Sequence, residues 1–459
     1  MRCVQDITVC GLLVGSSLVV AATACNRSPN DASTSSVLHA NAFAGPAPNV
    51  SFDQVIEGSA QRMLKEGRQI FRYDTFGSEA FWGDALQLHK AIAGEKNGGV
   101  GPGVSPKTAL AVGLKVDADA LPDALKEQLK AGKVDLDDPA TTVELLKLNA
   151  VVGVTAFTNP DGGVRSMGIQ CAICHSTVDD SFAPGIGKRL DGWANRDLNI
   201  GTIVSLSPNT KPFTDLLGVD ESTLKKVLAS WGPGRFDAEL DKDGKALRPD
   251  GKQAGTLIPP AFGLAGVNLH TWTGFGSVPY WNAFVAVTEM HGSGTFLDAR
   301  LGNKSQYSVA AKSGSYNTRG KPDNVTAKLP SLHFYQLSIP APRAPAGSYN
   351  AEAFGRGNSL FDGKARCATC HVPPLFTEPG NNLHAPSEIG VDAFQADRSP
   401  TRMYRTAPLA GLWTHTKGGF YHDGRFATLL DVVNHYDVLM KLGLSAQERN
   451  DLVEYLKGI

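Results

Sequence analysis

Two short motifs in the chain combine cysteine and histidine at the same spacing. Cys171-Ala-Ile-Cys174-His175 and Cys367-Ala-Thr-Cys370-His371 both read C-x-x-C-H. In this pattern each cysteine sulfur can form a thioether with a vinyl group of a haem, and the following imidazole binds the iron. The spacing therefore predicts two covalently attached c-type haems, with His175 and His371 as their proximal iron ligands.

The other cysteines favour this interpretation over a zinc site. C-x-x-C is also half of a zinc knuckle, but such a site needs further cysteines or paired histidines nearby, and neither motif has them. The chain has 7 cysteines, of which Cys3, Cys10 and Cys25 lie near the N-terminus and the rest belong to the two motifs. Cys3 and Cys10 are expected to leave with an export signal, and Cys25 is expected to be lipidated or terminal, so no pair is left for a disulfide.

The first residues have the composition of an export signal. An apolar run from Val9 to Ala22 is too short to span a bilayer comfortably and ends in small residues. The next cysteine, Cys25, completes a lipoprotein-like cleavage box with alanine where leucine is preferred, so lipidation and ordinary cleavage both stay open. We predict a signal peptide over 1–25, a flexible tether over 26–50, and a periplasmic protein that is free or anchored outside the inner membrane through Cys25.

Composition limits the possible classes of protein. The chain has 459 residues, of which 42% are hydrophobic and 19% charged, and this suits a soluble globular protein of two or three domains. The net charge of -1 gives no support for a nucleic-acid partner. The 49 glycines and 27 prolines predict many turns and long irregular connections.

A short repeat indicates how the chain is divided. Gly67-Arg-Gln-Ile-Phe71 and Gly357-Asn-Ser-Leu-Phe361 each end a predicted helix in Gly-x-x-aliphatic-Phe, and the second runs directly towards Cys367. We therefore expect a mainly α protein with two cytochrome c-like haem domains, at 51–340 and 346–459. The N-terminal domain is enlarged by long loops and by an insertion at about 77–165.

Two local signals complete the expected elements. Ser445 and Glu448 form a capping box that starts the last helix, which is expected to pack against the helix ending at Phe361. Asp241-Lys-Asp-Gly244 imitates the opening of a calcium loop, but it lacks the downstream glutamate and predicts a hairpin turn.

The last 110 residues or so resemble the dihaem cytochrome c peroxidase family. Three segments occur in the order of that family, with one proline displaced by one position: Met403-Tyr-Arg-Thr-Ala-Pro-Leu409, Gly419-Phe-Tyr-His422-Asp-Gly424 and Thr428-Leu-Leu-Asp-Val-Val433. The resemblance implies that Met403 is the axial ligand of an electron-transferring haem. In the branch of cofactor-maturing dihaem enzymes a tyrosine replaces this methionine, and Tyr404 is adjacent here. The other candidates for this position are His384, His415, His422 and Met440.

The sixth ligand of the first haem is less constrained by the sequence. Met290 is the first choice, because it ends an aromatic-rich helical run before a glycine-rich turn. The alternatives are His291, His270 and His89. The glutamate and glutamine with which the peroxidase family handles peroxide have no identifiable counterparts, so the catalytic residues stay unknown.

Two functions follow from these features. Two haems with a methionine ligand predict a periplasmic dihaem cytochrome c that exchanges electrons with other redox proteins. The alternative is a dihaem peroxidase- or oxygenase-like oxidoreductase with one open-coordination haem. The large aromatic N-terminal part favours this alternative, because electron transfer alone needs less protein.

Overall fold

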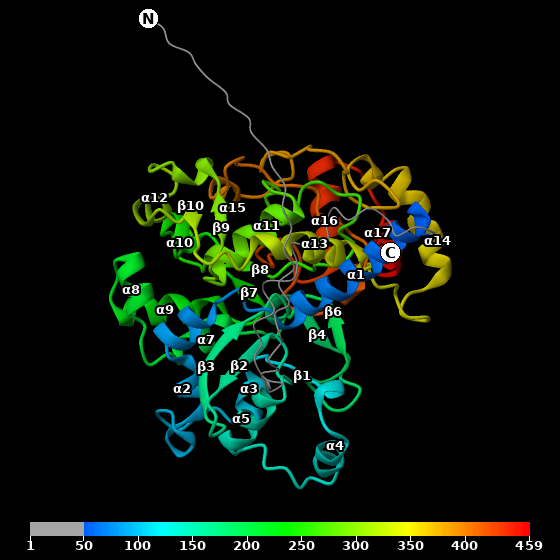
Figure 1. Ribbon diagram of the computed structural model, residues 1–459. Coiled ribbons are helices and arrows are strands. Elements are labelled where there is room, and N and C mark those ends of the chain that lie inside the picture. Colours follow the sequence, from blue (N-terminus) through cyan, green and yellow to red (C-terminus); the bar gives the residue numbers. More distant parts are fainter. Residues whose placement is uncertain (1–49) are drawn as a thin grey trace, which may run out of the picture. The chain divides into compact units, whose positions relative to one another are not determined.

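Helices form most of the regular structure in the computed structural model, which describes residues 50–459 (Figure 1). The expected mainly α class is thereby confirmed. The predicted signal peptide with Cys25, and the tether up to residue 49, lie outside the described residues. Residues 50–459 pack as one compact unit, and the predicted domain boundary between 340 and 346 stays a prediction.

The α-helices are short, apart from the first. In chain order they are α1 (Phe52–Tyr73), α2 (Leu88–Ala93), α3 (Pro106–Ala111), α4 (Asp123–Lys130), α5 (Pro139–Lys147), α6 (Ala172–His175), α7 (Ile200–Ser205), α8 (Lys211–Leu217), α9 (Glu221–Trp231), α10 (Leu240–Asp243), α11 (Val278–Phe284), α12 (Ser308–Ser313), α13 (Leu329–Ser338), α14 (Ala351–Asp362), α15 (Phe394–Asp397), α16 (Leu429–Met440) and α17 (Ala446–Gly458). Two π-helical turns are η1 (Ala80–Ala85) and η4 (Val285–Glu289), and one of the 3-10 turns is η7 (Cys367–Thr369). Among the described helices, none combines the length and the apolar character needed to cross a membrane.

The strands pair only in twos. They are β1 (Val116–Asp117), β2 (Val154–Thr158), β3 (Val164–Ile169), β4 (Ser176–Val178), β5 (Ile186–Gly187), β6 (Arg189–Asp191), β7 (Arg235–Phe236), β8 (Thr256–Leu257), β9 (Thr295–Leu297) and β10 (Asn317–Arg319). Strands β1 and β5 are parallel, whereas the pairs β2–β3, β4–β6, β7–β8 and β9–β10 are antiparallel. In the described part of the chain, therefore, no extended sheet organises the fold.

The repeated glycine motif marks two close helix crossings. On α1, a Cβ atom at Gly67 would lie 1.9 Å from the carbonyl oxygen of Ser331 on α13. On α14, a Cβ atom at Gly357 would lie 2.1 Å from the carbonyl oxygen of Asp451 on α17. Each motif thus lets one helix approach the backbone of another, which no larger residue permits at this distance.

The C-terminal crossing is also held by polar contacts. Arg356 on α14 donates to both carboxylate oxygens of Asp451, each at 2.8 Å. Ser445 and Glu448 form the predicted capping box at the start of α17. The expected cap and the expected packing of the last helix against α14 are both confirmed.

Alanine at Gly357 is expected to lower the free energy of unfolding by about 1–3 kcal/mol, because the added methyl group forces α14 away from α17. Gly355 on the same helix provides the control, since a Cβ there meets nothing within 4 Å. Alanine at that position should raise stability by roughly 0.5–1 kcal/mol through helix propensity. Chemical denaturation of both variants measures the difference, and equal effects would contradict the close crossing.

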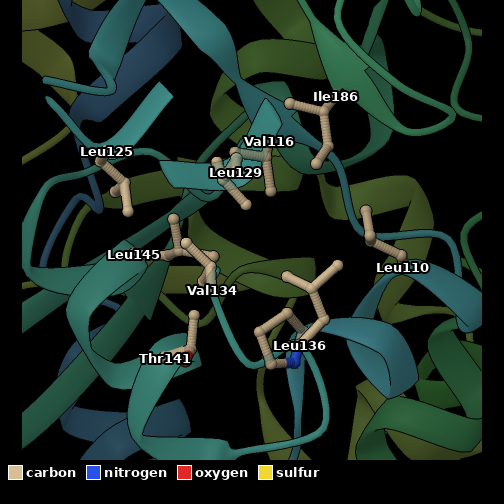
Figure 2. A pocket seen from close by; sticks show the side chains of 10 residues that line it. Leu110, Val116, Leu125, Leu129, Val134, Leu136, Thr141, Leu145 and Ile186 are labelled. Carbon is tan, nitrogen blue, oxygen red and sulfur yellow. The ribbon is translucent and has the colours of Figure 1, made fainter. Parts of the chain in front are cut away.

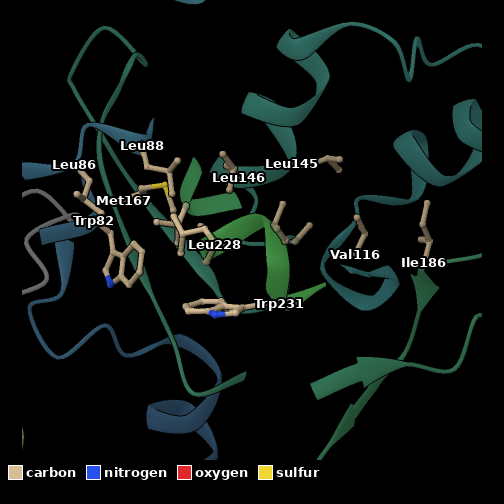
Figure 3. Packing of buried hydrophobic residues seen from close by; sticks show 14 of the residues in the cluster. Trp82, Leu86, Leu88, Val116, Leu145, Leu146, Met167, Ile186, Leu228 and Trp231 are labelled. Carbon is tan, nitrogen blue, oxygen red and sulfur yellow. The ribbon is translucent and has the colours of Figure 1, made fainter. Parts of the chain in front are cut away.

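The region predicted as an insertion shares an apolar cluster with later parts of the chain. Trp82, Leu88, Leu146, Met167 and Trp231 are among its buried members, and they come from strand β3 and the helical segments around it (Figure 3). A smaller apolar pocket lies beside it, where Leu125 and Leu129 of α4 join a set of aliphatic side chains (Figure 2). Trp82, Leu88 and Met167 of the large cluster also line the cavity described next.

Candidate haem-binding site

One large cavity of about 570 Å³ is lined by both C-x-x-C-H motifs. The first motif forms α6 and the residue before it, and the second forms η7 and the two residues after it. All six of their cysteines and histidines line the cavity: Cys171, Cys174, His175, Cys367, Cys370 and His371. The rest of the wall consists mainly of aliphatic and aromatic side chains, which suit the face of a porphyrin.

The histidine of each motif is held by a backbone carbonyl. Nδ1 of His175 lies 3.2 Å from the oxygen of Pro259, and Nδ1 of His371 lies 3.0 Å from the oxygen of Phe376. A carbonyl can only accept, so it fixes the Nδ1–H tautomer and leaves Nε2 to bind a metal. Burial lowers the pKa of His175 to about 4 and also lowers that of His371, which keeps both rings in the neutral form that binds iron.

The four cysteines of the motifs are not joined in disulfides. Burial raises the pKa of Cys171 and Cys174 to about 12 and that of Cys367 to about 11. Each cysteine pair therefore lies in the cavity wall as neutral, unbridged sulfurs beside a neutral imidazole. This set of donors, in a cavity of this lining, fits two covalently attached haems.

The candidate ligands for the first haem differ in whether they line the cavity. Met290 is 3% exposed and lines the cavity, while its carbonyl oxygen accepts from Nε1 of Trp82 at 2.9 Å. His270 lines the cavity as well, with Nε2 3.0 Å from the carbonyl oxygen of Val267. His291 instead stacks on Phe81 with ring centroids 3.6 Å apart. Neither His291 nor His89 belongs to the wall.

For the second haem, the structure places Met403, which the resemblance implied as ligand, and its neighbour Tyr404 differently. Met403 is 38% exposed and lies outside the wall, whereas its neighbour Tyr404 is 3% exposed and lines the cavity. Tyr404 stacks on His422 with centroids 5.0 Å apart, and its hydroxyl donates to the carbonyl of Asp392 at 3.1 Å. Met403 stays a prediction as axial ligand, and its side chain would have to turn inward from solvent to reach an iron.

The remaining named candidates, His384, His415, His422 and Met440, all line the cavity. His384 is engaged on both sides, with Nε2 2.7 Å from Glu378 and Nδ1 2.8 Å from Glu388. Burial is the largest single effect and lowers the pKa of His384, but the two carboxylates together outweigh it and raise the pKa above its usual value. A histidine bound at both nitrogens is poorly placed to ligate iron without losing one partner.

Sequence reasoning missed a buried acid in the wall. Glu289 precedes Met290, lines the cavity, and accepts from Nζ of Lys242 at 3.1 Å. Burial raises the pKa of Glu289 to about 8, although Lys242 opposes this. The one available signal was a single acid within an otherwise apolar run, and its partner lies 47 residues away.

A second buried ionic group joins distant parts of the chain. Arg398 is fully buried and donates to Asp237 at 2.9 Å and to Asp243 at 2.8 Å. The segment that was expected to form a hairpin turn at 241–244 is instead the end of α10, closed by Gly244 at φ +74°. That prediction was wrong, because Lys242 and Asp243 of α10 are buried and paired with the distant Glu289 and Arg398.

Comparisons with known proteins give a partial match. No family model matches the chain. Over 157 residues, 30% of this chain and 44% of the relative, it is 32% identical to methylamine utilization protein MauG of Methylorubrum extorquens. The chain thus spans less than half the length of this relative. The match relates part of this chain to part of MauG.

Two solved structures are similar over about half of the chain. Hydrazine synthase of Kuenenia stuttgartiensis is 20% identical, covering 47% of this chain and 76% of its own, with a TM-score of 0.28. A MauG-like protein associated with microbial copper homeostasis is 16% identical, covering 48% and 79%, with a TM-score of 0.29. At these low scores, the sequence match to MauG is the comparison that bears on the relationship.

Proposed function

We propose that the protein is an exported dihaem c-type redox protein that exchanges electrons with other redox proteins. The observation that carries this proposal is the single cavity lined by both motifs. Because both motifs line one cavity, two porphyrins held by them would lie close to each other, which favours electron exchange between them. The haems supply one-electron chemistry when bound, and the match to MauG supports a redox role.

The residues of the chain then have separate roles. The four motif cysteines hold the porphyrins covalently, and His175 and His371 bind iron through Nε2, with their rings oriented by Pro259 and Phe376. For the second haem, the buried position of Tyr404 favours it over Met403 as the residue facing the iron. Export to the periplasm and a tether through Cys25 belong to the same proposal and rest on the N-terminal sequence.

A second candidate function is peroxidase- or oxygenase-like chemistry at the first haem. The observation that favours it is Glu289, a buried acid in the wall beside Met290. An acid in an apolar cavity offers a hydrogen-bonding partner to a small oxygen-containing molecule. This function requires that Met290 leave the sixth position of the first iron open.

The test is the spectrum of the protein matured with c-type haem attachment machinery. We expect two covalent haems per chain, with two reduction steps in a redox titration. Two low-spin signals in electron paramagnetic resonance, without turnover of added peroxide, would favour electron transfer. A high-spin signal with peroxide turnover would favour the second candidate. A colourless product from a strain that matures other c-type cytochromes would contradict both.

A further inference from the structure

Two arginines in the cavity wall have no carboxylate partner. Arg196 is 9% exposed, and none of its three guanidinium nitrogens has a hydrogen-bond partner within the described chain. Arg405 donates from Nη1 to the carbonyl oxygen of Leu269, but its Nε is buried without a partner. Burial lowers the pKa of each to about 10, which leaves both charged at neutral pH. A buried, unpaired guanidinium is costly, so an anion is expected beside each one.

The other charged groups of the wall are already compensated. Glu289 pairs with Lys242, and Glu388 pairs with His384. Glu239 is bonded by the side chain of Gln395 and lies near Arg398. The remaining arginine of the wall, Arg366, is exposed. Arg196 and Arg405 are therefore the charges within the described wall that lack a counterpart.

Each arginine belongs to the segment that follows one motif and lies close to residues of the segment that follows the other. Arg196 follows the first motif, and the amide of the preceding Asn195 donates to the carbonyl of Cys174 at 2.9 Å. Nη1 of Arg196 would lie 3.5 Å from a Cβ atom added at Gly418, a residue beyond the second motif.

Arg405 shows the reverse arrangement. It lies 34 residues or so beyond the second motif, yet its amide donates to the carbonyl of Trp272 at 3.1 Å, and its guanidinium to that of Leu269. The two unpaired cations thus lie where the segment of the first motif meets the segment of the second, in the wall of the shared cavity.

We propose that Arg196 and Arg405 are carboxylate-binding residues, each of which holds a haem propionate where the two segments meet. The inference rests on the proposed function only in requiring that haems be bound. Propionates are the anions that a porphyrin itself carries into an otherwise apolar cavity, and a guanidinium can bind a carboxylate through two parallel hydrogen bonds. A free carboxylate from solution has the same chemistry and is the alternative source.

The site predicts a change in reduction potential when a cation is removed. Arg196→Gln and Arg405→Gln should each lower the midpoint potential of at least one haem, because an uncompensated propionate stabilises the oxidised iron. Arg196→Lys and Arg405→Lys keep the charge and should shift the potential less, in the same direction. Arg62→Gln, on the exposed face of α1, is the control and should leave both potentials unchanged.

The measurement is a spectroelectrochemical titration of each holoprotein, with covalent haem content determined alongside. If the wild type carries two haems and neither glutamine variant shifts a potential, the carboxylate site is wrong while the dihaem function stands. If a glutamine variant fails to fold, the lysine variant at the same position is titrated instead. A lowered midpoint potential in that variant then supports the proposal, and an unchanged one contradicts it. A wild type without haem would instead contradict the proposed function.

A second arm distinguishes the two sources of carboxylate. The wild-type potentials are measured with increasing acetate at constant ionic strength. Tethered propionates predict potentials that do not change with acetate. A potential that moves with acetate in the wild type, and no longer does so in Arg196→Gln or Arg405→Gln, would show a free anion at the site and overturn the propionate assignment.

Discussion

Replacing Cys367 and Cys370 together by alanine is expected to reduce the covalent haem content from two per chain to one. Both sulfurs lie in the cavity wall beside His371, and they are the thiols within the described residues near that histidine. Without them the second porphyrin has no thioether attachment and is removed by acid and organic solvent. Mass spectrometry of the denatured protein and the haemochrome spectrum measure the loss.

The matched control is Thr369→Ser, which changes the same motif but leaves the cysteines and His371 in place. It should retain both haems. The pair Cys171→Ala with Cys174→Ala should likewise leave one haem, and all four changes together should leave none. Two covalent haems in the first double variant would mean that this motif does not attach a porphyrin.

Replacing Arg398 by methionine is expected to lower the free energy of unfolding by about 3–5 kcal/mol. The side chain is fully buried, and its loss leaves Asp237 and Asp243 buried without their cation. Arg62→Met is the control, since that arginine is 61% exposed and its pair with Glu66 contributes little. Denaturation of both variants gives the comparison.

Two further measurements test the cause of that loss. Combining Arg398→Met with Asp237→Asn and Asp243→Asn should recover part of the stability, because the uncompensated charges are gone. Burial already raises the pKa of Asp237 to about 7, and removing Arg398 raises it further. A carboxyl group whose pKa is raised in the folded state lowers the free energy of unfolding. This cost grows as the pH rises from the pKa of the unfolded state, about 4, to the pKa of the folded state.

The sign of the pH dependence follows from these pKa values. In the wild type the cost at Asp237 stops growing near pH 7, whereas in Arg398→Met it continues to grow above that pH. The deficit of the variant should therefore be larger at about pH 9 than at about pH 6. A deficit that is the same at both values would mean that lost packing, and not the unpaired charge, destabilises the variant.

The features that sequence could predict are those determined within a few residues. The cap at Ser445 is a local hydrogen-bond pattern, and the structure has it as expected. The Gly-x-x-aliphatic-Phe repeat could be recognised in the sequence. In the structure, its glycines Gly67 and Gly357 lie at two close helix crossings. The mainly α class followed from similar local signals.

The features that sequence could not predict depend on partners far along the chain. The exposure of Met403 and the burial of Tyr404 depend on how one loop lies against the cavity. The sequence alone does not indicate which of two adjacent residues faces inward. The segment at 241–244 looked like a solvated turn because its partner Arg398 is 155 residues away from Asp243. Unpaired arginines such as Arg196 become visible only when every neighbour is known.

The shared cavity has a consequence for how the molecule is assembled. Its wall is built from residues that range from Trp82 to Leu456, so the compartment is complete only when nearly the whole chain has come together. Under the proposed function, the porphyrins would have to enter before the chain closes, while the attachment enzymes can still reach the cysteines. A chain that closes too early would exclude both porphyrins at once, and the order of these two events decides the yield of mature protein.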